Sequence, residues 1–255
     1  MSAGSRPAPD EARAARGLPL AGSTPSPADA GGPAPDGVAA ARPPGHPGVE
    51  PPSRRGRSRD AARDLAAGAQ VHLRGVAFVA GGFDAPGGME GQARGLAEAL
   101  ARRGLPVTFL TTAPPGAGLP RRELRGLVEV FRFPVPAAVD WRTSLAAFEL
   151  FAWGVLAGRR ERVELVYGVH HETGALAVQL ARALGRPSVV KLACAGEQGD
   201  AFAVCRHPER RRLLRALRRA TRVVAISSQV AAEAEAVLGL DPARLLRLPN
   251  GVDLR

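Results

Sequence analysis

The sequence predicts an α/β fold, in which a doubly wound and mostly parallel sheet is preceded by a disordered tail. From residue 71 onward, short apolar runs alternate with longer segments of helical periodicity. The short runs do not alternate apolar with polar residues, which is typical of strands buried on both faces of a parallel sheet. The glycine-rich segment "PGGMEGQ" follows the first run, at residues 86–92. Ligands of doubly wound sheets bind beyond the carboxyl ends of the strands, where this segment is expected to lie.

Residues 1–69 differ in composition from the rest of the chain. They contain 12 of the 23 prolines and almost no large apolar residues. A segment of this kind cannot bury enough apolar surface to offset the entropy that it loses on ordering. We therefore expect a disordered tail over residues 1–69, or a misassigned start codon, and a folded domain over residues 70–255.

The first half of the folded domain begins with an apolar strand that leads through the glycine-rich turn into a helix. This helix ends at Gly104, and the third strand ends at Pro134 because proline cannot donate to a sheet ladder. The predicted elements are strand 73–80, helix 89–104, strand 106–112, strand 126–134 and helix 144–157.

The second half continues the alternation of strands and helices. One of its helices is strongly basic and has Leu213, Leu214 and Leu217 on one face. Strands that alternate with helices in this way form a parallel, Rossmann-like sheet. The predicted elements are strand 163–169, helix 172–185, strand 187–193, basic helix 208–220, strand 221–227, helix 228–239, and a short strand with a turn over 243–253.

Composition limits the partners and the compartment of the protein. The net charge is +11, but the arginines are scattered and aromatic residues make up only 4%, so we expect no nucleic-acid partner. Lys191 is the only lysine among 35 basic residues, an arginine bias typical of a GC-rich bacterial genome. Cys194 and Cys205 provide neither a disulfide framework nor a metal site, which indicates the cytoplasm. No apolar run is long enough for a secretory signal or a membrane span.

Two common phosphate-binding motifs do not fit the glycine-rich segment. A dinucleotide fold requires G-x-G-x-x-G and then an acidic residue at the end of the second strand, but here that strand ends in Thr111 and Thr112. A P-loop is excluded because the sequence G-K-[ST] does not occur. The glycines that break the dinucleotide spacing are Gly81, Gly82, Gly87, Gly88 and Gly91.

Three segments follow one another at a spacing that points to a family. "GGMEGQARGLAEALARRGLPVTFLTT" at 87–112 has a glycine pair, a helix and a strand ending in threonine. "VYGVHHETGALAVQLARALGRPSVVKLA" at 166–193 is a strand, a helix and a second strand. "ATRVVAISSQVAAEAEAVLGLDPARLLRLPNGVD" at 220–253 has a strand ending in serine, a helix and then "PNGVD". In this order they resemble the N-terminal domain of the family 4 glycosyltransferases.

The resemblance implies one half of a two-domain GT-B fold. In that family a nucleotide-diphosphate sugar donates its sugar, with retention, to an acceptor bound in the interdomain cleft. The donor is a substrate, and neither a cofactor nor a metal is usually needed. The chain stops at Arg255, just after "PNGVD", so we expect it to be the acceptor-binding half, with the C-terminal donor domain absent. The implied activity is hexosyltransferase-like, and the implied acceptor is a glycan, a lipid-linked molecule or a small molecule.

Two other hypotheses stay open for this chain. It could be a non-catalytic Rossmann-like binding module, or one half of a split glycosyltransferase with the donor domain on a separate chain. In either case we expect the chain alone to be inactive. No catalytic residue is assigned.

The glycine pair and the first helical turn after it are the first candidate site residues. The resemblance implies that the N–H groups of Gly87 and Gly88 face the donor diphosphate, although a tight turn explains the same glycines. Met89, Glu90 and Gln92 contact the acceptor in this interpretation, or Glu90 and Gln92 merely cap the helix.

A histidine pair follows the carboxyl end of a strand. Members of the family often have H-x-H on this strand, but those places fall on Tyr167 and Val169 here. A substrate role for His170 and His171 therefore requires a shift in register. No acidic or cysteine cluster in the sequence completes a metal site around them.

The last candidates lie in two later segments. Glu197 and Asp200, in the loop "ACAGEQGDAF", bind sugar hydroxyls or simply solvate the loop. Asn250, Gly251 and Asp253 form a turn that reaches the cleft in the family, so structural and functional roles are both open.

The basic helix has two readings as well. Its arginines form a solvated face or a surface for anionic lipids, as in family members that act on lipid-linked acceptors. We therefore expect a cytoplasmic protein, with peripheral contact at the inner face of the membrane as the alternative.

Overall fold

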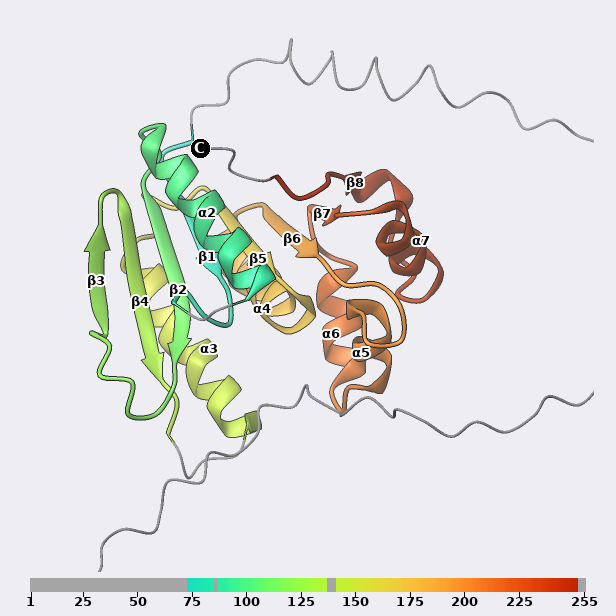
Figure 1. Cartoon of the computed structure of the whole chain (residues 1–255), viewed down its shortest axis with the longest axis horizontal. Coiled ribbons are helices and arrows are strands. Elements are labelled where there is room, and N and C mark those ends of the chain that lie inside the picture. Colours follow the sequence, from blue (N-terminus) through green and yellow to red (C-terminus); the bar gives the residue numbers. More distant parts are fainter. Residues whose placement is uncertain (1–72, 85–86, 137–140, 252–255) are drawn as a thin grey trace, which may run out of the picture. The chain divides into compact units, whose positions relative to one another are not determined.

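The computed structural model of the chain describes residues 73–84, 87–136 and 141–251 (Figure 1). The tail predicted over residues 1–69 lies outside this part. Within the described residues, no helix combines the length and the apolar character that crossing a membrane requires.

The described residues form one sheet of eight strands, which confirms the predicted fold class. The strand order is β3-β4-β2-β1-β5-β6-β7-β8. All neighbouring strands are parallel except β3 and β4, which are antiparallel. The strands are β1 (Val76–Val79), β2 (Val107–Ala113), β3 (Arg122–Arg125), β4 (Val128–Pro134), β5 (Leu165–Val169), β6 (Ser188–Leu192), β7 (Arg222–Ala225) and β8 (Leu245–Arg247).

Helices connect the parallel strands and cover both faces of the sheet. Figure 1 shows α2 crossing one face, with α3 and α4 behind the sheet. The helices are α2 (Gly88–Arg102), α3 (Trp141–Ala157), α4 (His171–Leu184), α5 (Asp200–Arg206), α6 (Arg210–Leu217), α7 (Ser228–Ala236) and the short 3-10 helix η1 (Pro242–Arg244).

Alternate residues of β1 enter separate parts of the core. Ala77 and Val79 pack with side chains of α3 and α4, whereas Val76 and Phe78 pack with side chains of α2. Because both faces are covered, β1 is buried along its whole length. This burial explains why the strand is a continuous apolar run in the sequence.

Three elements were not predicted from the sequence, namely β3, α5 and the 3-10 helix η1. The edge strand β3 has the charged and mostly exposed sequence "RELR", so it carries no apolar pattern. Charged residues are common on edge strands because they discourage pairing with other chains. The short helix α5 lies before the basic helix predicted over 208–220, where the sequence indicated only a loop, and α6 spans only Arg210–Leu217.

Close packing fixes the position of α4 against β5. A Cβ on Gly168 would lie 2.6 Å from the Gly174 Cα and 2.9 Å from the Thr173 carbonyl oxygen. A Cβ on Gly174 would lie 2.5 Å from the Val190 Cγ1. Glycine at both positions therefore lets the first turns of α4 lie directly on the sheet, at the carboxyl end of β5.

The connections diverge on either side of the central pair β1 and β5. The chain leaves β1 through α2 on one face and leaves β5 through α4 on the opposite face. Such a topological switch point opens a crevice at the carboxyl ends of the strands.

Candidate functional site

A cavity of about 170 Å³ lies at the switch point between β1 and β5. Its wall combines the ends of these two strands with the first turns of α2 and α4. Among the residues predicted from the sequence, the cavity brings together Met89, Glu90 and His170. The lining residues are Ala80, Gly81, Met89, Glu90, Val169, His170, Glu172 and Thr173.

The N-terminus of α2 faces the cavity without a side-chain cap. Gly87 is the N-cap residue and has no side chain that could accept from the first-turn N–H groups, so these donors are left for another acceptor. A Cβ on Gly88 would meet no atom of the described residues within 4 Å. The Glu90 carboxylate lies against Gly87, where the positive end of the helix dipole stabilises a negative charge.

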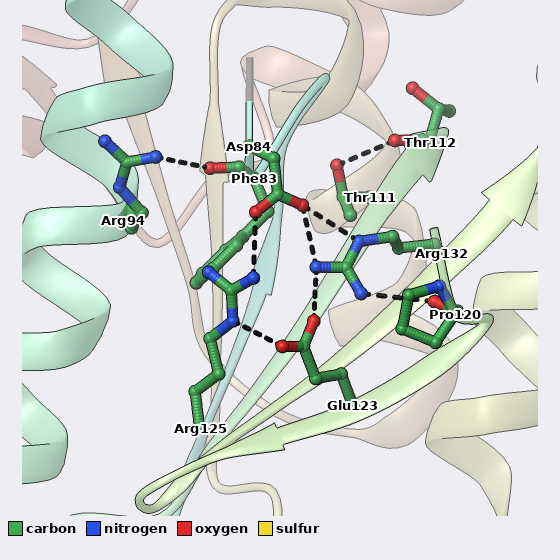
Figure 2. Close-up of polar contacts among 9 residues, drawn as sticks. All are labelled: Phe83, Asp84, Arg94, Thr111, Thr112, Pro120, Glu123, Arg125 and Arg132. Atoms are coloured by element: carbon green, nitrogen blue, oxygen red, sulfur yellow. Dashed lines mark hydrogen bonds and ion pairs between the residues drawn. The ribbon is translucent and has the colours of Figure 1, made fainter. Parts of the chain in front are cut away.

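Two contacts hold the loop that joins β1 to α2. Phe83 is buried, and its ring packs edge-on against Phe109 with the centroids 4.7 Å apart. Arg94 of α2 donates from Nη1 to the Phe83 carbonyl oxygen at 3.1 Å. Figure 2 shows that this bond links the loop to the helix that follows it.

An ion pair with β4 provides the strongest anchor of the loop. Arg132 is 1% exposed and donates to Asp84 Oδ2 from Nη2 at 2.7 Å and from Nε at 3.0 Å. Arg132 also donates to Glu123 Oε2 at 2.8 Å and to the Pro120 carbonyl oxygen at 3.1 Å. Figure 2 shows Arg132 between these acceptors, so its buried charge is well compensated.

Arg125 of β3 closes this network. It contacts Asp84 Oδ1 at 3.2 Å and donates to Glu123 Oε1 at 2.7 Å. Hydrogen bonds from Arg125 and Arg132 lower the pKa of Glu123. This network was not predicted from the sequence, although an arginine inside the apolar strand "VEVFRFP" is a signal for a buried charge with partners.

The histidine pair lies where β5 leads into α4. His170 is the N-cap of α4 and has φ 73°, a left-handed conformation that is uncommon outside glycine. His170 lines the cavity, and its ring centroid lies 3.8 Å from that of the buried His171. Tyr167, one of the two residues at the expected H-x-H places, is buried against Phe78, and burial raises its pKa to about 12.

Asp200 supports both histidines from the first turn of α5. Its Oδ1 accepts from the His171 backbone N–H at 3.2 Å and lies 3.1 Å from the His171 Nδ1. Its Oδ2 accepts from the N–H groups of Ala193 and Cys194 at 2.8 and 3.1 Å. The His170 Nε2 lies 3.4 Å from Oδ1.

The protonation states follow from this arrangement. Burial opposes ionisation of Asp200, but the His171 hydrogen bond, the nearby His170 and the two backbone donors outweigh burial and lower its pKa. Burial lowers the pKa of His170 more than the neighbouring Asp200 raises it. At neutral pH the cavity therefore presents a neutral imidazole, which can accept a hydrogen bond.

His170, His171 and Asp200 also have ligand atoms within 4.8 Å of one another, close enough to share a metal ion. Asp200 already interacts with four N–H groups, however, and three of them belong to the backbone. Its oxygens therefore have little capacity left for a cation. We interpret the three residues as a hydrogen-bonded support for the start of α4.

The remaining predicted residues do not belong to the cavity lining. The Gln92 Nε2 donates to the Gly251 carbonyl oxygen at 2.9 Å, so the turn after β8 lies beside the first turn of α2. Asn250 is exposed next to Gly251. Glu197 is exposed in the loop between β6 and α5, and its carbonyl oxygen accepts from Arg206. Asp253 lies outside the described residues.

Comparison with known proteins gives a family match over most of the described part. The sequence model of the glycosyl transferase 4-like domain matches residues 87–251. Among curated proteins, none matches the sequence significantly.

Several solved structures share the fold at low sequence identity. Sucrose-phosphate synthase from Thermosynechococcus elongatus aligns over 71% of this chain with a TM-score of 0.57 and 18% identity. Anabaena HepE in complex with UDP-glucose aligns over 71% with a TM-score of 0.46 and 16% identity. The lipopolysaccharide outer core galactosyltransferase WaaB, in its apo form, aligns over 71% with a TM-score of 0.47 and 12% identity. The chain covers 49%, 45% and 46% of these three proteins, respectively.

Proposed function

This chain belongs to the glycosyl transferase 4-like family, and from that premise we propose that it is the acceptor-binding half of a retaining glycosyltransferase that uses a nucleotide-diphosphate sugar. The observation that carries the proposal is the cavity at the switch point, which lies between the uncapped N-terminus of α2 and His170. It combines donors suited to a phosphate with acceptors suited to a hydroxyl group.

We assign the diphosphate side of the cavity to Gly87 and Gly88. As the sugar leaves, negative charge accumulates on the terminal phosphate of the donor. Backbone N–H groups that are fixed before the reaction stabilise such charge without reorganisation. Phe83 and Asp84 anchor the chain just before these glycines.

We assign the acceptor side to His170, Met89, Glu90 and Gln92. The neutral imidazole of His170 accepts a hydrogen bond from a sugar hydroxyl group, and Glu90 offers a carboxylate on the opposite wall. Met89 adds apolar surface. Glu197, Asn250 and the turn through Asp253 extend this side in the same proposal, while His171 and Asp200 hold His170 in place.

A second candidate is half of a split glycosyltransferase. The chain spans about half the length of the sucrose-phosphate synthase that it matches, and in this hypothesis the described sheet supplies one wall of an interdomain cleft. The donor domain then belongs to another chain that docks at the carboxyl edge of the sheet.

We propose a cytoplasmic location with peripheral contact at the membrane. The support for this proposal is the exposed basic surface of α6, which includes Arg210, Arg211 and Arg215. Arg212 is engaged with Glu149 and is not part of that surface. Anionic lipid head groups attract such a surface.

Gly88→Val tests the phosphate role. Gly88 has open space around it, so the valine side chain fits the fold but lies where a phosphate would approach. In a preparation that contains the donor-binding domain, we expect the rate of transfer to fall by about 10²–10³, the usual effect of losing one such donor interaction. Transfer is measured as nucleoside diphosphate release.

Gly95→Val is the matched control. Gly95 lies in the same helix and is exposed, and a Cβ there also meets nothing within 4 Å. Both variants place a β-branched residue in α2. Equal transfer rates for the two variants would show that Gly88 is only part of a turn.

A further inference from the structure

Lys191, the only lysine in the chain, is buried in the middle of the sheet. It lies in β6 and is 9% exposed. Its register neighbours are Val169 in β5 and Val224 in β7, both apolar and buried. The Lys191 side chain thus leaves the sheet between two valines, and its burial disfavours the charged form of the amine.

The side chain lies on the cavity side of the sheet. Val190 and Leu192 pack into the core formed with α4, α6 and α7, so Lys191, between them, points to the opposite face. Val169, its neighbour on that face, lines the cavity. The His170 backbone N–H donates to the Lys191 carbonyl oxygen at 2.9 Å, which places Lys191 directly beside the cavity wall.

Lys191 differs from the other buried cation in having no counter-charge. Arg132 is satisfied by Asp84, Glu123 and Pro120. Among the residues that the structure describes, none forms an ion pair or a side-chain hydrogen bond with Lys191. Burial lowers its pKa, and no neighbouring charge acts against this effect. A buried amine without a counter-charge favours its neutral form, so an anion that binds beside it would stabilise the protonated form.

We propose that Lys191 is the cation of a phosphate-binding site beside the switch-point cavity. A phosphate fits because the first-turn N–H groups of α2 open onto the same cavity and favour anions, while the charge of Lys191 would offset the carboxylates of Glu90 and Glu172 that also line it. Lysine binds phosphate as a compact point charge on a flexible stem, which suits a position recessed in a sheet. This inference deepens the proposed function. It rests on that function only where it identifies the phosphate as a group of a substrate.

Two sources would supply the phosphate. One is the diphosphate of a nucleotide-sugar donor, and the other is a phosphorylated acceptor. Pyrophosphate and UDP represent the first source in the test, and glucose 6-phosphate represents the second. Galacturonate, which carries a carboxylate instead, tests the ligand class.

The single lysine allows a direct measurement on the full chain. Growth with ¹³C,¹⁵N-lysine gives one set of lysine side-chain NMR signals, assigned by their loss in Lys191→Arg. We expect a pKa below the reference of about 10.4, and a saturable shift of the signals with pyrophosphate, UDP or glucose 6-phosphate. Phosphate binds the protonated amine, so saturation should raise the pKa by about one unit, equivalent to a tenfold preference for that form.

Two variants distinguish phosphate binding at Lys191 from non-specific attraction of phosphate to the positive net charge of the protein. Calorimetry should show at least tenfold weaker phosphate binding for Lys191→Gln. Arg222→Gln should bind as the unchanged chain does, because Arg222 lies on the same face in β7 but is exposed. Equal losses in both variants would overturn the proposal, as would an ordinary pKa, the lack of a saturable shift, or a response to galacturonate alone. None of these readouts depends on glycosyl transfer, so the proposed function can fail while this site stands.

Discussion

Arg132 and Asp84 illustrate how a single ion pair connects the core to the candidate site. Arg132 projects from β4, yet its main partner belongs to the loop between β1 and α2. The same loop leads to Gly87 and Gly88. The guanidinium group of Arg132 is buried, and its three acceptors fix its orientation. Arg132 therefore holds Asp84 in one position relative to β4.

Asp84→Asn should loosen the loop more than the fold. The substitution removes the negative partner of charge-assisted hydrogen bonds worth about 1.5–3 kcal/mol, so the loop should open roughly tenfold more often. Hydrogen exchange followed by mass spectrometry measures this opening. We expect faster exchange at residues 81–84 and in the first turn of α2, with the exchange of β5 and α4 unchanged.

Glu129→Gln provides the control for the loss of a salt bridge as such. Glu129 lies in β4, the strand that also contains Arg132, and it pairs with Arg159 and Arg122, away from the loop between β1 and α2. It should leave exchange at residues 81–84 unchanged. If Asp84→Asn speeds exchange evenly over the whole sheet, the ion pair stabilises the fold and does not position the loop.

At the scale of elements, the close packing of α4 on β5 positions the candidate site. Gly168 and Gly174 let the helix lie directly on its own strand, and the helix thereby presents His170 to the cavity. A side chain at either glycine has to displace backbone or core atoms.

Gly168→Ala should therefore destabilise the protein. The new methyl group would meet the Gly174 Cα and the Thr173 carbonyl oxygen, and overpacking of this kind typically costs about 1–3 kcal/mol. Urea unfolding measures the change in the free energy of unfolding. Gly95→Ala, in the exposed middle of α2, should instead stabilise the chain by about 0.5–1 kcal/mol because alanine favours helix.

A stability of Gly168→Ala equal to that of the unchanged chain would contradict this account of the packing. It would mean that α4 can move away from β5 at little cost. In that case His170 would not be fixed relative to the cavity.

Elements could be predicted where the sequence pattern is local. The buried parallel strands are apolar runs, and glycine or proline ends several of them, so β1, β2 and β4 through β8 were all expected. The strand β3 was missed because its charges face solvent at an edge and it pairs only with β4. The helix α5 was missed because it is short and its first residue, Asp200, resembles a loop residue in sequence.

The candidate site, like the elements, could be predicted only where local sequence patterns indicate it. Strand ends and glycine turns placed Met89, Glu90 and His170 near one another, because the carboxyl ends of parallel strands meet at one edge. The partners of Asp84 and Asp200 could not be predicted, since Arg132 and His171 are 48 and 29 residues away and their contacts depend on side-chain packing. The sequence shows Lys191 as the only lysine of the chain but does not indicate that it is buried beside the cavity.

At the scale of the molecule, the proposed function makes the described sheet one wall of a site. Glycosyl transfer requires donor and acceptor to be held together in reactive geometry, an advantage of about 7–11 kcal/mol in favourable cases. One wall also cannot exclude water from an activated donor. We therefore expect the 255-residue chain by itself to bind ligands without turning them over.

The measurement is a panel of nucleotide sugars and acceptors offered to the purified chain, with and without a donor-binding domain from a family member. Nucleoside diphosphate release and glycosylated product should be seen only with the added domain. Acceptor-dependent turnover by the chain alone, at the ordinary enzyme rate of about 10 s⁻¹, would show that the whole site lies within it.

The central place of β1 in the sheet also has a consequence for biosynthesis. This strand is made first among the eight, but its neighbours are β2 and β5, and Val76 pairs with Val107 on one side and Leu165 on the other. At a translation rate of about 5–20 residues per second, the second partner leaves the ribosome roughly 5–20 s after β1. During that interval one edge of an entirely apolar strand is unpaired. The nascent chain therefore depends on its rate of synthesis, or on a chaperone, to keep that edge from pairing with another chain.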